Sequence, residues 1–335
     1  MMTREFLLIR RPEGIPEAND FRLSTRTLDP LAEQLVRVRT LLWGVDPGLR
    51  GRLSDETSYA APMELGSAVT GFVVGEVIES RDPRLAAGDV VTGAWGWREI
   101  ADVSPAAISP APERGGLPLE SLLGLLGIPG ITAYFGMLDV GQVKSGERVL
   151  VTSAAGGVGS IACQIGKIKG AQVTGLAGGT DKCAWLRDSL GLDAVIDYKA
   201  EADLDAALAR VFPDGIDVVF ENIGNRMVDT LLNHIRDQGR IVICGQTADY
   251  NLPPEQRHGI RNTRNIIGRR LRIQGLVAMD YASRYEEARR DLRTWAAAKK
   301  LITKEEIEVG FERLPGAFVS LFEGSKLGRK LVAAA

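Results

Sequence analysis

The feature that most constrains the fold is a short apolar run that ends in a glycine-rich turn. Residues 149–152 read Val-Leu-Val-Thr, and Ser-Ala-Ala-Gly-Gly-Val-Gly follows at residues 153–159. This is the GxGxxG spacing with Ala154 in the first place. Gly156 allows backbone to come close to a pyrophosphate, and Gly159 allows a helix to pack tightly on the strand before it. Strand, turn and helix in succession predict a dinucleotide-binding site.

The turn stands at the head of a regular alternation of strands and helices. Strands are predicted at residues 148–152, 172–176, 194–197, 217–221, 240–244 and 272–277. Helices are predicted between the first five of them, at residues 159–169, 181–190, 204–211 and 227–235. Gly170, Gly191 and Gly239 stand just past three of these helices, where helices commonly end. The pattern predicts an α/β fold with a doubly wound parallel Rossmann sheet.

The two ends of the chain follow a different pattern. Residues 4–112 alternate apolar and polar side chains in short runs, which predicts strands of a small antiparallel barrel at residues 36–40, 71–79 and 89–92. The end of the chain does not continue the strand–helix alternation, and residues 327–332 read as one more strand. We therefore expect a barrel-like, mainly β catalytic domain at residues 1–120, completed by 300–335, and a Rossmann domain at residues 121–299. The substrate pocket is expected between them, at the carboxyl ends of the parallel strands.

Composition excludes several classes of function. The 41 Lys and Arg against 43 Asp and Glu give a net charge of −2, which provides no basic surface for nucleic acid. No stretch approaches the ~18 apolar residues of a membrane span, and the first residues lead into no signal-peptide core, so we expect a cytoplasmic protein without membrane partners. Three cysteines and two histidines, scattered along the chain, argue against a zinc enzyme, and we expect no metal.

The second predicted strand indicates which dinucleotide is bound. An enzyme that uses NAD carries an acid at the end of this strand for the ribose 2′-hydroxyl, but residues 174–180 contain none. Lys182 follows within the turn, and a cation there favours the 2′-phosphate of NADP(H). The alternative is that Lys182 is a solvated lysine at a helix start, partly neutralised by Asp181.

Several runs in order resemble the medium-chain dehydrogenase/reductase superfamily. They are Gly-Ile-Pro-Gly-Ile-Thr-Ala-Tyr-Phe-Gly at 127–136, Gly-Glu-Arg-Val at 146–149, the turn at 153–159, Asp-Val-Val-Phe-Glu-Asn-Ile-Gly at 217–224 and Gly-Arg-Ile-Val-Ile-Cys-Gly at 239–245. Within the superfamily the chain is most similar to the zinc-independent, NADPH-dependent alkenal/one reductases, which include leukotriene B4 dehydrogenase (prostaglandin reductase), plant double-bond reductases and curcumin reductase. The resemblance implies a GroES-like barrel beside the Rossmann domain, and a homodimer formed through the Rossmann sheet edge.

The resemblance also implies roles for individual residues. Lys182 and Tyr198 match the family's contacts to the 2′-phosphate. Thr132 matches a threonine near the nicotinamide, and Asn222 matches the family's asparagine after the fourth strand. Tyr250 matches a tyrosine near the substrate and the cofactor ribose, which makes it the candidate catalytic residue. The remaining expected cofactor contacts are Ala154, Gly156, Gly157, Val158, Gly159, Thr180, Gly245 and Lys326.

The chain departs from the family pattern at three places. Gly66–Gly71 replaces the Gly-His-Glu zinc motif of related alcohol dehydrogenases. Gly48 stands where an aromatic residue is common, which is expected to reshape the substrate pocket, and Arg50 beside it could anchor a substrate carboxylate or lie on the surface. Lys326 brings a charge where an amide is usual. Trp43, Tyr59, Trp95 and Trp97 could line the pocket, with core packing as the alternative for the tryptophans.

The predicted reaction is transfer of hydride from NADPH to the β-carbon of an α,β-unsaturated aldehyde or ketone, a small-molecule substrate, followed by protonation at the α-carbon. The developing enolate needs hydrogen-bond donors, for which Tyr250 and the nicotinamide-ribose hydroxyl are the candidates. Two alternatives stay open. One is an NADPH-dependent quinone reductase of the same fold, and the other is an NADPH-binding subunit without turnover, which Gly48 and Lys326 would favour.

Overall fold

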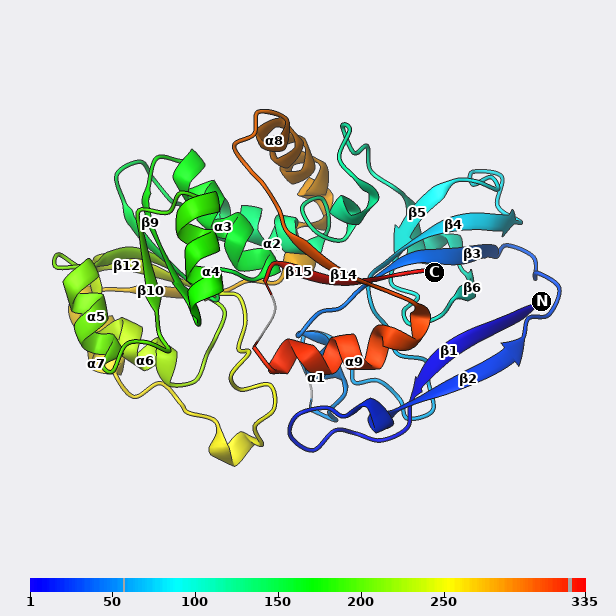
Figure 1. Cartoon of the computed structure of the whole chain (residues 1–335), viewed down its shortest axis with the longest axis horizontal. Helices are drawn as coiled ribbons and strands as arrows, with labels where there is room; N and C mark the ends of the chain where they lie inside the picture. Colours follow the sequence, from blue (N-terminus) through cyan, green and yellow to red (C-terminus); the bar gives the residue numbers. More distant parts are fainter. Residues whose placement is uncertain (57, 325–326) are drawn as a thin grey trace. The chain divides into compact units, whose positions relative to one another are not determined.

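The structure is a computed structural model that describes residues 1–56, 58–324 and 327–335 (Figure 1). It divides into two compact units. Unit 1 comprises residues 1–123, 305–326 and 330–335, and unit 2 comprises residues 124–304 and 327–329. In the described part of the chain, the helices are all too short or too polar to cross a membrane.

Unit 2 is built on a six-stranded sheet in the order β10-β9-β8-β11-β12-β13. Every neighbouring pair is parallel. The strands are β8 (Arg148–Thr152), β9 (Gln172–Ala177), β10 (Ala194–Asp197), β11 (Ile216–Glu221), β12 (Ile235–Ile243) and β13 (Arg272–Gly275). The strand order reverses direction between β8 and β11, which is the switch point of a doubly wound sheet. The predicted fold class is therefore confirmed.

Helices cover both faces of this sheet. A Cβ on Gly166 would lie 2.8 Å from Cγ2 of Val173, so α3 (Gly157–Ile168) packs closely on one face of β9. Leu176, three residues further along β9, points to the other face and joins one apolar cluster with Leu208 and Leu231. Those two residues belong to α5 (Leu204–Val211) and α6 (Arg226–Leu232). The other helices of the unit are α2 (Ile128–Phe135), α4 (Thr180–Ala184), α7 (Thr263–Arg269) and α8 (Tyr285–Ala297).

One predicted boundary is wrong. The sequence predicts a helix at residues 227–235 and a strand from 240, but α6 ends at Leu232 and β12 begins at Ile235. Ile235 pairs with Ile216 of β11, and the register shifts before Val218 pairs with Arg240. Gly239 therefore lies inside an irregular strand, where a Cβ would come within 2.2 Å of the Ile235 side chain. Long-range pairing across this irregularity overrides the local helical pattern.

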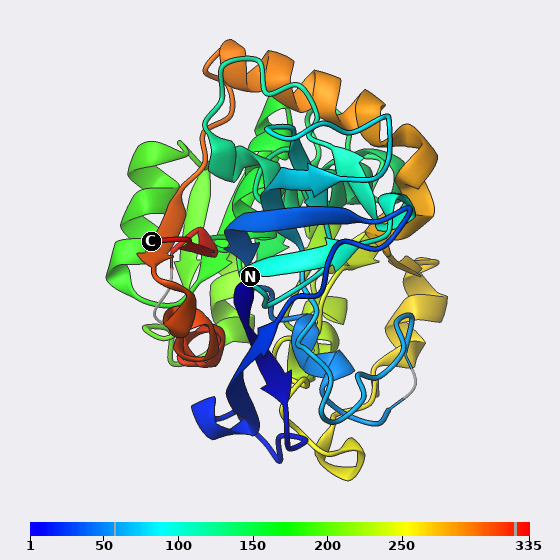
Figure 2. The same cartoon turned by 90° about the vertical axis from the view of Figure 1, so that its right-hand side faces the viewer.

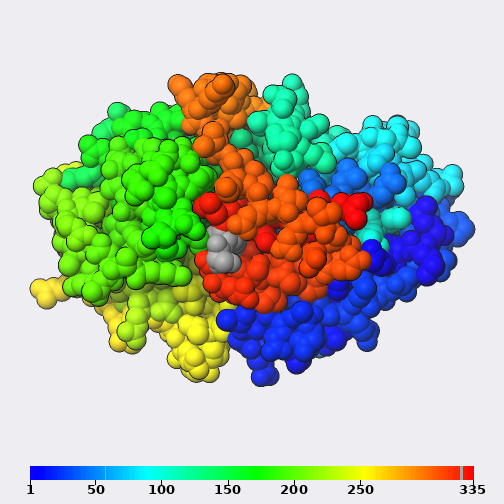
Figure 3. Space-filling view, viewed as in Figure 1, coloured from blue at the N-terminus to red at the C-terminus, as the bar shows by residue number. Residues whose placement is uncertain are grey.

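Unit 1 is mainly β. A seven-stranded sheet runs β14-β15-β3-β4-β5-β7, with β6 paired to β3. From β15 to β7, and between β6 and β3, neighbouring strands are antiparallel. β1 and β2 form a separate antiparallel ribbon, seen in dark blue in Figure 2. The strands are β1 (Met2–Leu8), β2 (Phe21–Thr27), β3 (Val36–Gly44), β4 (Val73–Ser80), β5 (Val90–Gly93), β6 (Ile100–Val103), β7 (Ile108–Pro110), β14 (Glu305–Val309) and β15 (Arg329–Ala333). Two short helices, α1 (Leu49–Arg52) and α9 (Leu314–Val319), complete the unit. β14 is an edge strand, and its segment is exposed on the face shown in Figure 3.

Aromatic side chains form the core of unit 1. Trp43, Trp95 and Trp97 are all buried. The Trp97 ring lies 6.0 Å from the ring of Phe6 and 5.0 Å from that of Phe21. Trp95 donates a 2.8 Å hydrogen bond from its indole nitrogen to the hydroxyl of Thr40. Core packing is therefore the correct interpretation of these tryptophans.

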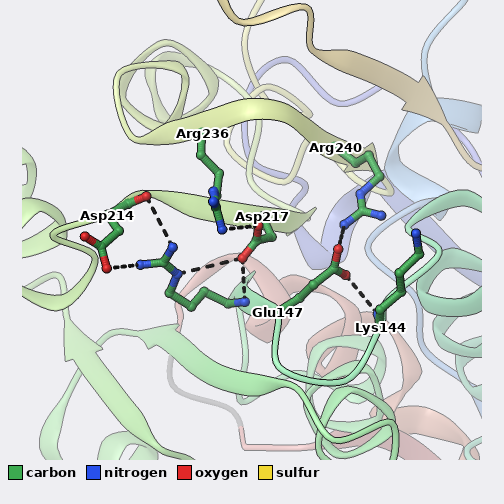
Figure 4. A network of polar contacts seen from close by, with 7 residues as sticks. Lys144, Glu147, Asp214, Asp217, Arg236 and Arg240 are labelled. Atoms are coloured by element: carbon green, nitrogen blue, oxygen red, sulfur yellow. Dashed lines mark hydrogen bonds and ion pairs between the residues drawn. The ribbon is translucent and has the colours of Figure 1, made fainter.

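The amino-terminal edge of the parallel sheet is held by paired charges (Figure 4). The Asp217 carboxylate accepts hydrogen bonds from the Arg148 backbone N–H at 2.8 Å and the Arg236 guanidinium at 3.0 Å. The Arg148 guanidinium also binds Asp214 at 2.8 Å. Arg240 of β12 pairs with Glu147, just before β8. These contacts join the starts of β8 and β11 to β12.

Candidate active site and cofactor-binding site

The glycine turn after β8 forms a tight strand-to-helix connection. Ser153 adopts a positive φ of 49°, and α3 begins at Gly157 after the N-cap Gly156. A Cβ on Gly159 would lie 2.3 Å from the backbone oxygen of Ser153, so no side chain fits there. The first hydrogen bond of the helix is donated by Ser160 to Gly156 at 3.0 Å, so the amides of residues 157–159 have no partner inside α3. They can bind an anion.

Ala154 and residues 327–329 support this turn. Ala154 is buried and donates its backbone N–H to Leu176 of β9 at 3.0 Å. Gly328 forms an isolated parallel β-bridge with Gly156. Its backbone N–H donates a hydrogen bond to the backbone oxygen of Ala155 at 2.8 Å. The Arg329 side chain passes 3.3 Å from the position of a Cβ on Gly157. Sequence reasoning missed Gly328 and Arg329, because only the fold brings the last residues of the chain to the glycine turn. Lys326, the expected contact nearby, lies outside the described residues.

Tyr198 and Lys182 lie around the turn that follows β9. The Tyr198 ring crosses Gly178, where a Cβ would lie 2.7 Å from the ring, and 42% of the tyrosine is exposed. Gly179 has a φ of 100° and is the N-cap of α4, which carries exposed Thr180 and partly buried Lys182. Because β9 and β10 are adjacent and parallel, the residues that follow both strands meet at one edge. The structure therefore places Tyr198 and α4, which carries Lys182, at the same turn.

An acid that the sequence prediction overlooked also lies at this turn. Asp197, the last residue of β10, accepts hydrogen bonds from the backbone N–H of Gly179 at 2.9 Å and of Lys199 at 3.0 Å. The bond from Gly179 is the main cause that lowers the pKa of Asp197. The prediction that this region lacks an acid holds for residues 174–180 but not for the neighbouring strand β10, which contributes the carboxylate. This carboxylate accepts hydrogen bonds from backbone amides of the turn.

Asn222 follows β11 and is buried. Its side-chain amide donates to the Thr152 backbone oxygen at 2.7 Å, and its backbone N–H donates to the Thr152 hydroxyl at 2.8 Å. Asn222 is therefore fixed beside the end of β8, where the glycine turn begins. Its own backbone oxygen accepts the Thr247 hydroxyl at 3.1 Å, which links it to the loop that carries Tyr250.

Glu221, the residue before Asn222, is fully buried. Its carboxylate accepts the backbone N–H groups of Ile223 at 2.8 Å and Gly224 at 2.9 Å, and the Thr152 hydroxyl at 3.1 Å. Burial raises the pKa of Glu221, and these hydrogen bonds oppose the rise. Burial also raises the pKa of the neighbouring Cys244 thiol to about 12, so this cysteine is not a nucleophile.

Tyr250 folds back over the start of its own loop. A Cβ on Gly245 would lie 3.6 Å from the Tyr250 hydroxyl oxygen and 3.1 Å from the Asn222 backbone oxygen. The Gln246 N–H approaches the same hydroxyl at 3.4 Å. Gly245, Asn222 and Tyr250 therefore lie together just beyond β11 and β12. The absence of a side chain at Gly245 leaves the Tyr250 hydroxyl close to the sheet edge.

The other predicted residues have different surroundings. Thr132 is buried on α2 and donates its hydroxyl to the backbone oxygen of Ile128 in the same helix at 2.7 Å. The Thr132 oxygen can then only accept a further hydrogen bond.

Arg50 is buried in unit 1 and donates to the backbone oxygens of Pro12 at 3.0 Å and Gly14 at 3.1 Å, so it holds a loop and does not lie on the surface. A Cβ on Gly48 would lie 3.7 Å from the hydroxyl of Tyr59, which is 69% exposed.

The sequence matches two known families. Residues 4–110 match the N-terminal domain of oxidoreductases, and residues 157–294 match the zinc-binding dehydrogenase family. Relatives include the NADPH-dependent curcumin reductase of Escherichia coli (37% identical, covering 98% of this chain and 96% of that protein) and the NADP(+)-dependent 2-alkenal reductase of Nicotiana tabacum (36%, 98% and 96%). The chain belongs to the medium-chain dehydrogenase/reductase superfamily, in the alkenal/one reductase branch.

Solved structures agree with this assignment. CurA of Vibrio vulnificus in complex with NADPH is 34% identical and superposes with a TM-score of 0.93 over 99% of both chains. The quinone oxidoreductase of Escherichia coli, also solved with NADPH, is only 19% identical at a TM-score of 0.80, which shows a shared fold and nothing more.

These relatives confirm the predicted class of enzyme. This member of the superfamily is an NADP(H)-dependent oxidoreductase of the group that reduces the C=C bond of enals and enones. The glycine turn fits the cofactor, because side chains are excluded at Gly159 and amides of the first turn of α3 lack helical partners. Over the described residues, no three His, Cys, Asp or Glu side chains are grouped so as to hold a metal ion.

Proposed function

We propose that this enzyme reduces α,β-unsaturated aldehydes and ketones with Tyr250 as the hydrogen-bond donor to the developing enolate oxygen. The observation that carries this proposal is the place of the Tyr250 hydroxyl, beside Gly245 and the Asn222 loop at the carboxyl ends of β11 and β12. Ligands of doubly wound sheets bind at these strand ends. A tyrosine hydroxyl can donate one hydrogen bond, which suits it to this role.

The cofactor contacts are assigned from the glycine spacing and from the family resemblance, and the turns after β8 and β9 support them. The amides of Gly157, Val158 and Gly159 would hold the pyrophosphate, and Ala154 and Gly156 shape the turn. Thr180, Lys182 and Tyr198 would hold the 2′-phosphate. Thr132, Asn222, Gly245 and Lys326 would provide the remaining contacts. When bound, NADPH supplies the hydride that adds to the β-carbon of the substrate.

The protein's part in the reaction is to stabilise charge and to orient groups. As negative charge develops on the carbonyl oxygen of the substrate, Tyr250 donates its O–H to that oxygen and lowers the barrier. Asn222 keeps its place because both its side-chain amide and its backbone N–H are held by Thr152. The α-carbon takes up a proton to complete the saturated carbonyl product. In this division of labour, residues 121–299 bind the dinucleotide, while residues 1–120 with 300–335 complete the catalytic part.

Replacement of Tyr250 tests the proposal. Tyr250→Phe should lower kcat for an enone by about 100-fold, since removal of one oxyanion donor typically costs on the order of 10² to 10³. The dissociation constant of NADPH, measured by fluorescence titration, should change little. Unchanged turnover would refute the role of Tyr250. The substrate panel should contain matched enals, enones and simple quinones with products identified by mass, because turnover of quinones alone would favour the quinone reductase instead.

We also propose a homodimer in the cytoplasm. β13 is one of the two edge strands of the parallel sheet, and an edge strand can pair with a second copy of the chain. Ile267 of α7, which precedes β13 in the chain, is 79% exposed. All three cysteines are free thiols, as is usual in a reducing compartment. Sedimentation velocity should give a dimer that Ile267→Glu weakens, whereas a monomer at micromolar concentration would contradict the proposed homodimer. Cell fractionation tests the proposed cytoplasmic location.

A further inference from the structure

Asn225 adopts a backbone conformation that ordinarily requires glycine. Its φ of 52° and ψ of −141° lie outside the regions open to most side chains. The residue is the N-cap of α6, and its side-chain oxygen accepts the Arg226 N–H at 2.8 Å. An ordinary loop would relax from such a conformation, so the contacts around Asn225 must hold it in place.

Asp249 supplies those contacts. This buried carboxylate accepts two hydrogen bonds from Asn225, from its backbone N–H at 2.8 Å and from its side-chain amide at 2.7 Å. The preceding Gly224 has a φ of 77°, and a Cβ there would lie 2.6 Å from Asp249 Oδ2. The carboxylate therefore sits directly against the loop backbone, with no room for another side chain.

The same contact joins the two loops of the candidate site. Residues 222–225 follow β11 and contain Asn222, and residues 246–250 follow β12 and contain Tyr250. Ala248 donates its N–H to Ile223 at 2.9 Å, and Thr247 donates its N–H to Asn222 at 3.2 Å. Asp249 adds the side-chain contact at the far end of this pairing, directly before Tyr250.

Two buried carboxylates thus accept hydrogen bonds from three consecutive backbone amides of the first loop, those of residues 223–225. Glu221 binds those of Ile223 and Gly224, and Asp249 binds that of Asn225. Glu221 lies in the strand that leads into this loop, and its carboxylate binds the loop and Thr152 of β8. Asp249 comes from the second loop, so it alone of the two carboxylates fixes one loop relative to the other.

We propose that the Asn225–Asp249 pair is a positioning device that sets the place of Tyr250 relative to Asn222. The inference rests on the proposed role of Tyr250 and adds to it a pair of residues that acts by holding the two loops together. A displacement of about 1 Å at a catalytic group can cost on the order of 100-fold in rate. Loss of the pair should therefore lower kcat more than it alters cofactor binding.

An exchange of the two side chains tests the pair. Asn225 donates two hydrogen bonds to the carboxylate of Asp249. In Asp249→Asn the new side chain has only one oxygen that can accept them. In Asn225→Asp two carboxylates face each other. The double variant Asn225→Asp with Asp249→Asn restores complementary donors and acceptors, and aspartate tolerates positive φ nearly as well as asparagine. We expect each single variant to lower kcat by about 10- to 100-fold and the exchange to return it to within about 3-fold of the parent.

A second readout does not depend on turnover. Hydrogen exchange, followed by mass spectrometry, should be faster over residues 223–226 and 246–251 in each single variant and return to the parent rate in the exchanged pair. The NADPH dissociation constant should change less than about 3-fold throughout. Parental kcat and exchange rates in the single variants, or a double variant as impaired as its parts combined, would overturn the proposal.

Tyr250→Phe separates this proposal from the one on which it rests. If the pair acts through Tyr250, adding Asp249→Asn to Tyr250→Phe should lower kcat no further, and a full additional loss would overturn the positioning role. If Tyr250→Phe alone retains full turnover, the proposed catalytic role of Tyr250 is wrong. The hydrogen exchange of the two loops then still decides whether the pair joins them. Asn225→Gly is a further variant, because glycine accepts the backbone conformation and keeps the backbone N–H that binds Asp249. It loses both side-chain bonds of Asn225, to Asp249 and from the Arg226 N–H, so we expect its kcat to fall less than that of Asp249→Asn. A larger loss in Asn225→Gly would count against the pair.

Discussion

The two ends of the parallel sheet use charge in opposite ways. At the amino-terminal edge, acids pair with guanidinium groups, as Asp217 does with Arg236 and Glu147 with Arg240 (Figure 4). At the carboxyl-terminal edge, Asp197, Glu221 and Asp249 accept hydrogen bonds from backbone N–H groups of the loops. The first arrangement joins strands, and the second shapes turns.

This difference bears on where an anion can bind. At the amino-terminal edge, the carboxylates of Asp217 and Glu147 pair with guanidinium groups. At the opposite edge the carboxylates bind particular loop amides, while the amides at the start of α3 lack partners within the helix. An anion can therefore bind at the carboxyl-terminal edge through backbone groups.

The largest expected effect is at the glycine turn. Gly159→Ala places a Cβ 2.3 Å from the Ser153 backbone oxygen, so α3 must move away from β8. We expect a loss of stability of ~3 kcal/mol and an NADPH dissociation constant raised on the order of 100-fold. Thermal unfolding and fluorescence titration measure the two. Gly268→Ala in α7 is the control, because no atom lies within 4 Å of the new Cβ. Equal behaviour of the two variants would show that close packing at the turn is unimportant.

Lys182→Ala should affect the cofactor without affecting the fold. Charge-assisted hydrogen bonds contribute ~1.5 to 3 kcal/mol, so NADPH binding should weaken roughly 10- to 150-fold while NADH binding changes little. Dissociation constants for both cofactors measure this ratio. Lys169→Ala, at the exposed C-cap of α3, should leave both unchanged. Equal losses for NADPH and NADH would refute the contact with the 2′-phosphate.

At the amino-terminal edge, Asp217→Asn should change stability alone. The variant keeps the size of the side chain but loses its attraction to Arg148 and Arg236, at an expected cost of ~1 to 2 kcal/mol. Urea unfolding should show this difference shrinking at high salt, since paired charges are screened. The values of kcat and KM should match the parent. A reduced kcat at parental cofactor affinity would mean that the two edges are not independent.

Asp197→Asn should give the smallest effect, and pH distinguishes it from the previous variant. Hydrogen bonding to Gly179 lowers the pKa of Asp197, so the ionised carboxylate stabilises the folded state at pH above its unfolded value of ~3.9. That stability is lost as the pH falls through the lower folded value. The difference in unfolding free energy between parent and variant should therefore be constant from pH 7 to 5 and shrink toward pH 3. A difference that grows in acid would contradict this assignment.

Local sequence patterns determined much of unit 2. The alternation of apolar runs and helical periodicity predicted all six strands, and the glycine spacing located the turn after β8, because both signals arise within a few residues of chain. The same locality explains the failures. The helix expected to reach residue 235 stops at Leu232, since Ile235 pairs with a strand that lies earlier in the sequence.

The sequence by itself thus determined the fold class and the family, and through the family it indicated NADP(H) and Tyr250. Only the tertiary structure revealed Asp197 at the turn after β9, Gly328 against the glycine turn, and Asp249 beneath Asn225. Each of these contacts joins segments that are distant along the chain or that follow different strands. A single sequence carries no record of which loop amide a buried carboxylate will bind, because that choice is made when the parallel strands align their ends.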